Sequence, residues 1–161
     1  MKLAILSDTH SRYHTVEKAL AILRERGIDC IVHCGDIEDA ETVFLFQDFS
    51  THFVYGNCDT ERAGIADAIQ ESGGKLHEPF GDLVIAEQKI AWIHGDNKKL
   101  LQDVERSGHF EFLFYGHTHQ AEQHRTGRTR VVNPGALHRA KVKTFVILDL
   151  ATGGLESVVV A

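Results

Sequence analysis

The sequence predicts an α/β fold of four layers, αββα, in which two mixed β-sheets pack face to face and helices flank them. Over the first two thirds of the chain, short apolar and β-branched runs alternate with helical stretches. After Gly116 only short strand-like runs separated by turn residues remain. Helix-linked strands favour a parallel sheet and hairpins an antiparallel one, so this change predicts two packed sheets. The length of 161 residues, without linker or repeat, predicts one domain over residues 1–161.

The elements of the first half follow from apolar spacing and from glycine stops. Residues 2–7 are an apolar run that ends at Asp8, which predicts a strand. Residues 16–26 carry apolar side chains at 16, 19, 20, 22 and 23, a helical spacing that Gly27 ends. The other elements expected in this half are strands over residues 30–33 and 52–55 and helices over residues 40–49 and 61–72.

The second half begins with two short strands and then returns to a helix. Residues 82–86 and 89–93 are joined by a tight connection, which predicts a hairpin. Residues 97–106 predict a helix, and Thr126-Gly127 and Gly153-Gly154 supply later turns. The remaining strands are expected over residues 111–115, 122–125, 128–132, 143–150 and 155–160.

Composition excludes several classes of protein. Hydrophobic residues at 43% and charged residues at 25% are globular values. A net charge of −6 gives no general electrostatic attraction to nucleic acid or to an anionic membrane. We read no signal peptide, no membrane span and no CxxC pattern among the three cysteines, and therefore expect a cytoplasmic protein. The 11 histidines are the outlier, because histidine is the commonest metal ligand.

Nearly every apolar strand stops at an acidic, amide or imidazole side chain. The stops read SDTH, HCGD, YGNCD, WIHGD and FYGHTH in chain order. Each alone has an ordinary explanation as a turn or a helix cap. Ligands of open α/β sheets sit beyond the carboxyl ends of the strands, so five such ends together predict a shared site. Seven side chains are expected there: Asp8, His10, Asp36, Asn57, His94, His117 and His119.

These motifs are similar to those of a known superfamily. DTH, GD, GN, HG and GHTH resemble the five blocks of the calcineurin-like metallophosphoesterases. The chain length, the GNCD form of the third block and the sequence Asn133-Pro134-Gly135 resemble the small single-domain bacterial and archaeal phosphodiesterases. The retromer subunit of the same fold is their eukaryotic relative. The resemblance runs from Met1 to about Leu150 and implies the metallophosphoesterase fold.

The resemblance implies two divalent metal ions that share one carboxylate. Asp36 would be the shared ligand. The first ion would be held by Asp8, His10, Asp36 and His119, and the second by Asp36, Asn57, His94 and His117. Carboxylate, amide and imidazole ligands without thiolate suit Mn²⁺, which we expect, or Fe, Zn²⁺ or Ni²⁺, better than a structural zinc.

The implied activity is hydrolysis of a phosphodiester by in-line attack of a hydroxide that bridges the two metals. Two divalent ions, two carboxylates and one hydroxide leave a single positive charge, which complements a singly charged diester. Asn57 and Asp59 of the third block are expected to be catalytic. Arg12 and Asn57 are expected to contact the substrate, although an exposed Arg12 is an equal alternative.

The sequence departs from the family pattern at three positions. Cys58 stands where many relatives carry a histidine that protonates the leaving oxygen, and a thiol is a poor acid for that task. We interpret Cys58 as a residue that fills space, so activated diesters should react best. Asp96 stands where many relatives have a second histidine, which affects substrate contacts at most. Ser11 stands where a glycine often follows the histidine of the first block.

Two other functions remain as alternatives. The first is a protein-binding scaffold of the same fold in which catalysis is lost, although every ligand position is filled here. The second is a phosphomonoesterase, which the missing histidine of the third block disfavours. The expected partner is a small phosphodiester rather than a membrane. The basic stretch 124–130 is more simply a solvated hairpin than a nucleic-acid contact, and a homo-oligomer stays open.

Overall fold

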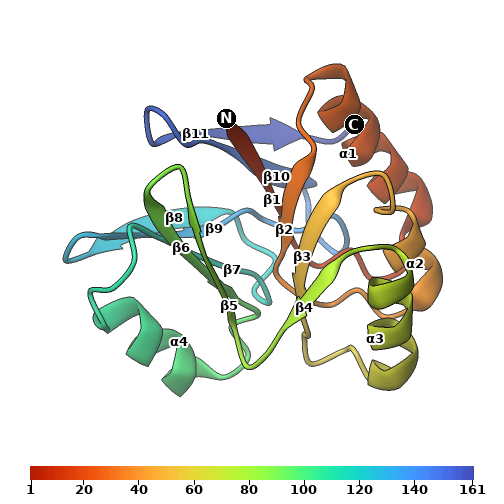
Figure 1. Cartoon of the computed structure of the whole chain (residues 1–161), viewed down its shortest axis with the longest axis horizontal. Helices are drawn as coiled ribbons and strands as arrows, with labels where there is room; N and C mark the ends of the chain where they lie inside the picture. The colour runs from red at the N-terminus through yellow and green to blue at the C-terminus, as the bar shows by residue number, and fades with distance from the viewer.

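The first sheet contains six strands in the order β11-β10-β1-β2-β3-β4 (Figure 1). The structure is a computed structural model that describes residues 1–161. β1 to β4 run parallel, β10 is antiparallel to β1, and β11 is antiparallel to β10. The bounds are Lys2–Leu6 (β1), Cys30–His33 (β2), Ser50–Val54 (β3), Lys75–His77 (β4), Thr144–Asp149 (β10) and Gly154–Val159 (β11).

The second sheet contains five strands in the order β5-β6-β7-β9-β8. β6, β7 and β9 run parallel, and the edge strands β5 and β8 are antiparallel hairpin partners of β6 and β9. Both sheets are therefore mixed, as predicted. The bounds are Gly81–Ile85 (β5), Gln88–Ile93 (β6), Phe112–Tyr115 (β7), Glu122–Thr126 (β8) and Thr129–Asn133 (β9).

Helices cover the outer faces of the two sheets, which gives the four predicted layers. α1 (Tyr13–Glu25), α2 (Ala40–Phe44) and α3 (Arg62–Glu71) lie against the first sheet, and α4 (Lys98–Arg106) lies against the second (Figure 1). None of these four helices combines the length and the apolar composition that a membrane crossing requires.

Alternation along the buried strands divides the apolar residues between the layers. In β1, Leu3 and Ile5 face the second sheet, whereas Ala4 and Leu6 face the helices. In β6, Trp92 packs between the sheets, together with residues of both. The central strands are thus buried on both faces, which leaves their carboxyl ends as the place where polar side chains can gather.

Three elements differ from the prediction by three or more residues. Strand β4 was not predicted, because its three residues, one exposed and two half-exposed, form no apolar run and its pairing with β3 alone defines it. Helix α1 begins at Tyr13, three residues before the predicted start, because its first turn is largely exposed and carries no apolar periodicity. Helix α2 ends at Phe44, and backbone bonds from residue i to i−3 carry Phe46 and Phe49 into the core before β3.

The C-terminal hairpin β10–β11 lies beside β1, at the opposite end of the chain. Lys2 pairs with Asp149 and Ile5 with Val146. The late hairpins therefore divide between the sheets: β8–β9 extends the second sheet, whereas β10–β11 completes the first. Sequence order alone does not indicate this division.

Candidate metal centre

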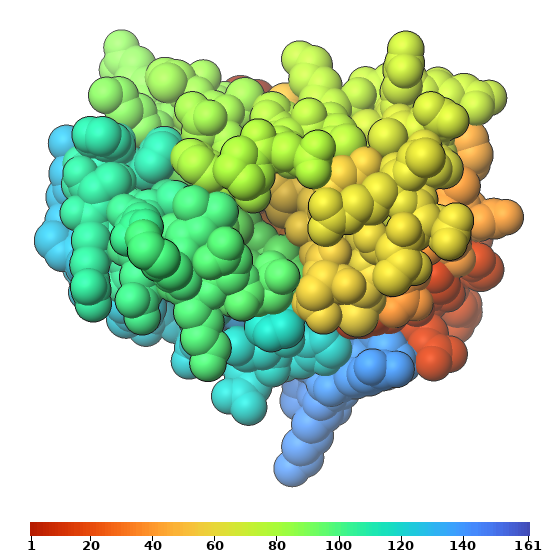
Figure 2. Space-filling view, turned by 90° about the horizontal axis from the view of Figure 1, so that it is seen from below, coloured from red at the N-terminus to blue at the C-terminus, as the bar shows by residue number.

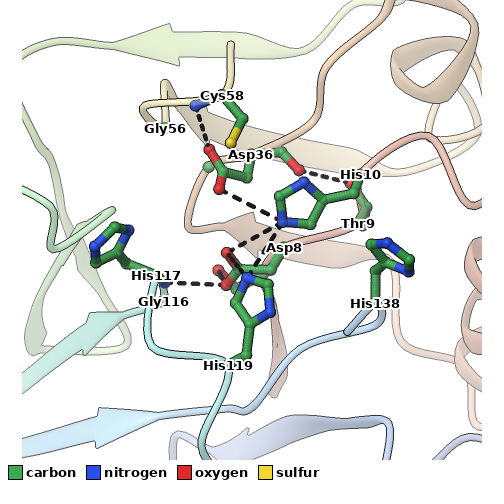
Figure 3. Close-up of polar contacts among 12 residues, drawn as sticks. Asp8, Thr9, His10, Asp36, Gly56, Cys58, Gly116, His117, His119 and His138 are labelled. Atoms are coloured by element: carbon green, nitrogen blue, oxygen red, sulfur yellow. Dashed lines mark hydrogen bonds and ion pairs between the residues drawn. The ribbon is translucent and has the colours of Figure 1, made fainter. Parts of the chain in front are cut away.

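The seven predicted site residues lie in the loops that follow five strands of the two sheets. β1 leads to Asp8 and His10, β2 to Asp36, and β3 to Asn57. In the second sheet, β6 leads to His94, and β7 leads to the two histidines at 117 and 119. Figure 3 shows Asp8, Asp36, His10 and His119 with their side chains directed toward one another.

The first half of the cluster joins two carboxylates and two imidazoles. The Nε2 atom of His119 lies 3.1 Å from Oδ1 of Asp8. The Nε2 atom of His10 lies 3.2 Å from Nε2 of His119 and 3.5 Å from Oδ2 of Asp36. One donor atom from each of these four residues lies within 4.8 Å of those of the other three. Four ligand atoms this close can surround a single ion.

The second half of the cluster is centred on the Asn57 amide oxygen. This Oδ1 atom lies 2.9 Å from Nε2 of His94 and 3.0 Å from Nδ1 of His117. The same His94 nitrogen lies 3.3 Å from Oδ2 of Asp36. One oxygen of Asp36 is therefore close to an imidazole of each half, so this carboxylate joins the two halves.

The buried carboxylate of Asp8 tests whether these residues fit metal ions. Its Oδ2 atom accepts hydrogen bonds from the Ser7 hydroxyl at 2.6 Å and the His117 backbone N–H at 3.1 Å. Its Oδ1 atom is buried and accepts no hydrogen bond. A buried carboxylate oxygen that accepts no hydrogen bond is costly, and a cation between it and the imidazoles of His10 and His119 would remove that cost. The donor set of oxygen and imidazole nitrogen also fits divalent transition metals.

Proton affinities at the site reflect burial and the close charges. Burial raises the pKa of Asp8. Burial also acts to raise the pKa of Asp36, but the hydrogen bond and the charge of His94 outweigh it and lower this pKa to about 2. In turn, burial acts to lower the pKa of His94, but Asp36 outweighs burial and raises it to about 9. The shared carboxylate is therefore ionised across the neutral range.

Two glycines allow the strand ends to approach one another. A Cβ atom on Gly56 would lie 2.1 Å from Oδ1 of Asp36. A Cβ atom on Gly116 would lie 1.9 Å from the Ser7 hydroxyl oxygen and 2.5 Å from Oδ2 of Asp8. Neither position can carry a side chain without displacing a carboxylate of the cluster or its hydrogen-bond partner. The glycines of the GN and GH motifs thus belong to the geometry of the site.

Asp59 contacts the backbone of the loop that carries Asp36. Its Oδ1 atom accepts the N–H groups of Ile37 at 2.8 Å and Glu38 at 2.7 Å. Its Oδ2 atom accepts those of Asp36 at 3.0 Å and Gly56 at 2.7 Å. Both oxygens are used in this way, so these contacts position the loop rather than face the cluster. A direct part of Asp59 in the chemistry stays a prediction of the sequence.

Glu38 is a site residue that sequence reasoning missed. Its Oε1 atom lies 2.6 Å from Nδ1 of His10, on the side of the ring away from the cluster. A carboxylate on the second nitrogen fixes the tautomer and the orientation of a metal-ligating imidazole. Glu38, His10 and Cys58 also bring three potential ligand atoms within 4.8 Å of one another. The spacing gave no signal, because Glu38 follows no strand directly.

The remaining predicted residues lie around this cluster. Arg12 donates from Nε to Nδ1 of His138 at 3.1 Å, and the His138 ring centroid lies 5.5 Å from that of His10. Cys58 donates its backbone N–H to Oδ1 of Asp36 at 2.9 Å. Burial, with the nearby charge of Asp36, raises the pKa of the Cys58 thiol to about 11. Arg12 is therefore beside the cluster, but it is held by a histidine rather than free.

His33 is one buried histidine that does not face the cluster. Its Nδ1 atom accepts the Gly35 N–H at 3.1 Å, and its Nε2 atom lies 3.2 Å from the Thr9 hydroxyl. The Thr9 hydroxyl also donates to the carbonyl oxygen of Asp36 at 3.3 Å. Both ring nitrogens are used, so His33 supports the loops instead of offering a ligand atom.

The fold and the site together define an αββα protein with a cluster of carboxylate, amide and imidazole side chains, which could hold metal ions, at the carboxyl ends of its strands. The sequence profile of the calcineurin-like phosphoesterase superfamily domain matches residues 1–153. The chain therefore belongs to the calcineurin-like phosphoesterase superfamily, as its motifs predicted.

Individual relatives agree with this assignment. Phosphodiesterase MJ0936 of Methanocaldococcus jannaschii is 27% identical over 154 residues, which cover 92% of this chain and 93% of the relative. A solved structure described as a novel archaeal phosphodiesterase is 26% identical, with a TM-score of 0.91 and 99% of both chains covered. Vps29 of Entamoeba histolytica, solved in complex with Zn²⁺, shares the fold with a TM-score of 0.66 and 18% identity over all of both chains.

Proposed function

We propose that the protein is a metal-dependent phosphodiesterase with a dinuclear centre, which hydrolyses a small phosphodiester by in-line attack. The observation that carries the proposal is the position of Asp36, whose Oδ2 atom lies 3.5 Å from the His10 imidazole and 3.3 Å from that of His94. A carboxylate shared in this way suits two ions a few ångströms apart. The phosphodiesterase name of the archaeal relative at 27% identity supports the same reaction.

The two halves of the cluster would hold one ion each. The first half comprises Asp8, His10, Asp36 and His119, and the second comprises Asp36, Asn57, His94 and His117. We propose Mn²⁺ as the native metal, with Fe, Zn²⁺ and Ni²⁺ as alternatives that the same ligands accept. When bound, such ions supply Lewis-acid activation of a water nucleophile and of the phosphoryl oxygens.

The chain's own residues would orient the substrate and limit the choice of leaving group. Asn57 lies between His94 and His117, so its amide can contact both the second ion and the diester. Arg12 lies beside His10 through His138 and can reach a phosphate oxygen if it leaves that histidine. The Cys58 thiol, with its pKa raised by burial to about 11, is a weak proton donor. We therefore expect activated diesters, such as aryl phosphates, to react best.

Hydrolysis of two aryl phosphates tests the proposal. Metal-stripped protein is supplied with Mn²⁺ and assayed on bis-p-nitrophenyl phosphate and on p-nitrophenyl phosphate. Turnover that requires Mn²⁺ and is much faster on the diester is expected. Faster turnover of the monoester would replace the proposal with a phosphomonoesterase. Inactivity on both esters with each of Mn²⁺, Fe, Zn²⁺ and Ni²⁺ would favour a protein-binding scaffold. We expect a cytoplasmic location for either the enzyme or the scaffold.

The shared carboxylate can be tested by substitution. Asp36→Asn should abolish turnover and remove one of two bound ions, because a neutral amide cannot bridge two cations as a carboxylate does. Metal content after dialysis measures the stoichiometry independently of activity. Asp29→Asn, an exposed position before β2, is the matched control. Retained turnover in Asp36→Asn would exclude the shared-carboxylate assignment.

A further inference from the structure

A small pocket opens beside the His94 half of the cluster. Its volume is about 170 Å³, and its wall includes Tyr55, Arg62, His94, Asp96, Asn97 and Leu100. Figure 2 shows the surface hollowed between α3, in yellow, and α4, in green, below the light-green segment that leads from β4 to β5. His94 lines the pocket, and its Nε2 atom lies 3.3 Å from Oδ2 of Asp36, so the pocket adjoins the proposed reaction centre.

One wall of the pocket carries a positioned guanidinium. The Cζ atom of Arg62 lies 4.6 Å from the ring centroid of Tyr55, and its Nε donates to the carbonyl oxygen of Asp59 at 3.3 Å. Its only carboxylate neighbour is Glu78, at 3.7 Å and largely exposed to solvent. The remaining N–H groups of Arg62 are therefore free to donate to a ligand in the pocket.

The opposite wall carries an acceptor and a donor from the loop before α4. Asp96 is exposed and makes no hydrogen bond or ion pair with the rest of the chain. Asn97 accepts the Leu100 N–H with its Oδ1 atom at 3.0 Å, which leaves its NH₂ group as a donor. Asp96 is also the residue that replaces the second histidine of the fourth block, so the departure from the family pattern falls in this pocket.

We infer that this pocket binds one alcohol substituent of the diester, and that the substituent is hydroxylated, as in a sugar or glycerol. The inference rests on the proposed function. A carboxylate, an amide NH₂ and a guanidinium provide acceptors and donors for neighbouring hydroxyl groups. A volume well below the roughly 300 Å³ of ordinary ligand sites excludes a large apolar substituent. Asp96 is the residue that would determine this specificity.

The experiment compares three p-nitrophenyl phosphodiesters that share one leaving group. Their second alcohols are methanol, glycerol and the 5′-hydroxyl of thymidine. The readout is kcat/KM for each hydroxylated ester divided by kcat/KM for the methyl ester, with KM and kcat recorded separately. Asp96→Ala should lower this ratio about tenfold or more, through KM, because hydroxyl hydrogen bonds to a charged group are lost. Asp103→Ala, on the solvent side of α4, is the matched control and should leave the ratio unchanged.

The outcomes separate the pocket from the centre. A fall of the ratio for the glyceryl ester alone identifies glycerol-like substituents, and a fall for the thymidine ester identifies a sugar. Turnover of all three esters with the same ratios in the wild type and in Asp96→Ala would overturn the pocket assignment and leave the phosphodiesterase intact. Absence of turnover of every ester by the wild type would overturn the proposed function, and the pocket assignment with it.

Discussion

Replacing Asp59 by Asn removes half of a buried anchor for the loop that carries Asp36. Asp59 is 2% exposed, and its two oxygens accept four backbone N–H groups at 2.7–3.0 Å. Asn keeps one oxygen, whereas its NH₂ group would face two N–H donors. Two buried donors then lose their partner, and each such loss costs about 1–3 kcal/mol. We expect the free energy of unfolding to fall by about 2–6 kcal/mol, a large part of the roughly 5–15 kcal/mol of a typical domain.

Urea unfolding of the metal-free protein, followed by circular dichroism with a chelator present, measures this loss without any contribution from bound ions. Asp67→Asn is the matched control, because Asp67 lies on the exposed face of α3 and makes no ion pair. Its unfolding free energy should change by less than about 0.5 kcal/mol. A change in Asp59→Asn as small as that of the control would refute the view that these four hydrogen bonds hold the loop.

Three further predictions address other parts of the site and the core. Glu38→Gln should weaken Mn²⁺ binding about 10–100-fold, because the carboxylate that orients His10 is lost; calorimetric titration measures this, with the exposed Glu41→Gln on α2 as control. Cys58→His should raise kcat/KM on unactivated diesters by at least about tenfold, because an imidazole can protonate the leaving oxygen; unchanged rates would mean that leaving-group protonation is not limiting. His52 is 6% exposed, and its pKa is lowered to about 4 by burial, so the unfolded chain binds a proton at this position that the folded chain does not. The stability that neutral His52 contributes is therefore complete above pH 6.5 and is lost as the pH falls toward 4, by about 2 kcal/mol between pH 7 and 5. Burial also lowers the pKa of other histidines, such as His33, so the fall in unfolding free energy between the two pH values should be smaller by about this amount in His52→Leu than in the wild type, which urea unfolding at the two pH values measures.

The sequence predicted which side chains form most of the candidate site because these residues closely follow buried strands. Asp8, Asp36 and His94 each come within three residues of an apolar run, and parallel strands bring such positions to one edge. By contrast, the sequence gives no reason to assign Glu38 to the candidate site rather than its neighbour Asp39. In the structure Asp39 caps α2 by accepting the Thr42 N–H, and only three-dimensional contact assigns Glu38 to His10.

Strand β4 and the position of the last hairpin were also beyond the sequence pattern. β4 has three residues, Lys75–His77, none of them buried, so its hydrophobic pattern carries no information. The pairing of β10 with β1 joins segments separated by almost the whole chain, and apolar alternation is equally compatible with either sheet. Local patterns predict which residues form strands, whereas the order of strands follows from packing that no local window contains.

The backbone at the site is strained in a way that residue types do not signal. Seven non-glycine residues there have left-handed φ angles: Asp8, His10, Ser11, Asp36, Glu38, His117 and His119. Such turns allow side chains two positions apart to face one point, as the histidines at 117 and 119 do on either side of the cluster. Each costs of order 1 kcal/mol, and backbone bonds such as that from the Asp8 N–H to the Gly35 carbonyl offset the cost.

Ser11 is a strained residue that neither offers a ligand atom to the cluster nor contacts one of its imidazoles, so it provides a test of this strain. Its φ is +55°, and a glycine, which often stands at this position in the superfamily, adopts that angle without steric cost. Ser11→Gly should therefore raise the free energy of unfolding by up to about 1 kcal/mol, reduced by the greater freedom of glycine in the unfolded chain. Urea unfolding measures the sign. Ser107→Gly, at the C-cap of α4 with ordinary helical angles, should destabilise instead, and a loss of stability in both variants would show that the left-handed turn at residue 11 stores no strain.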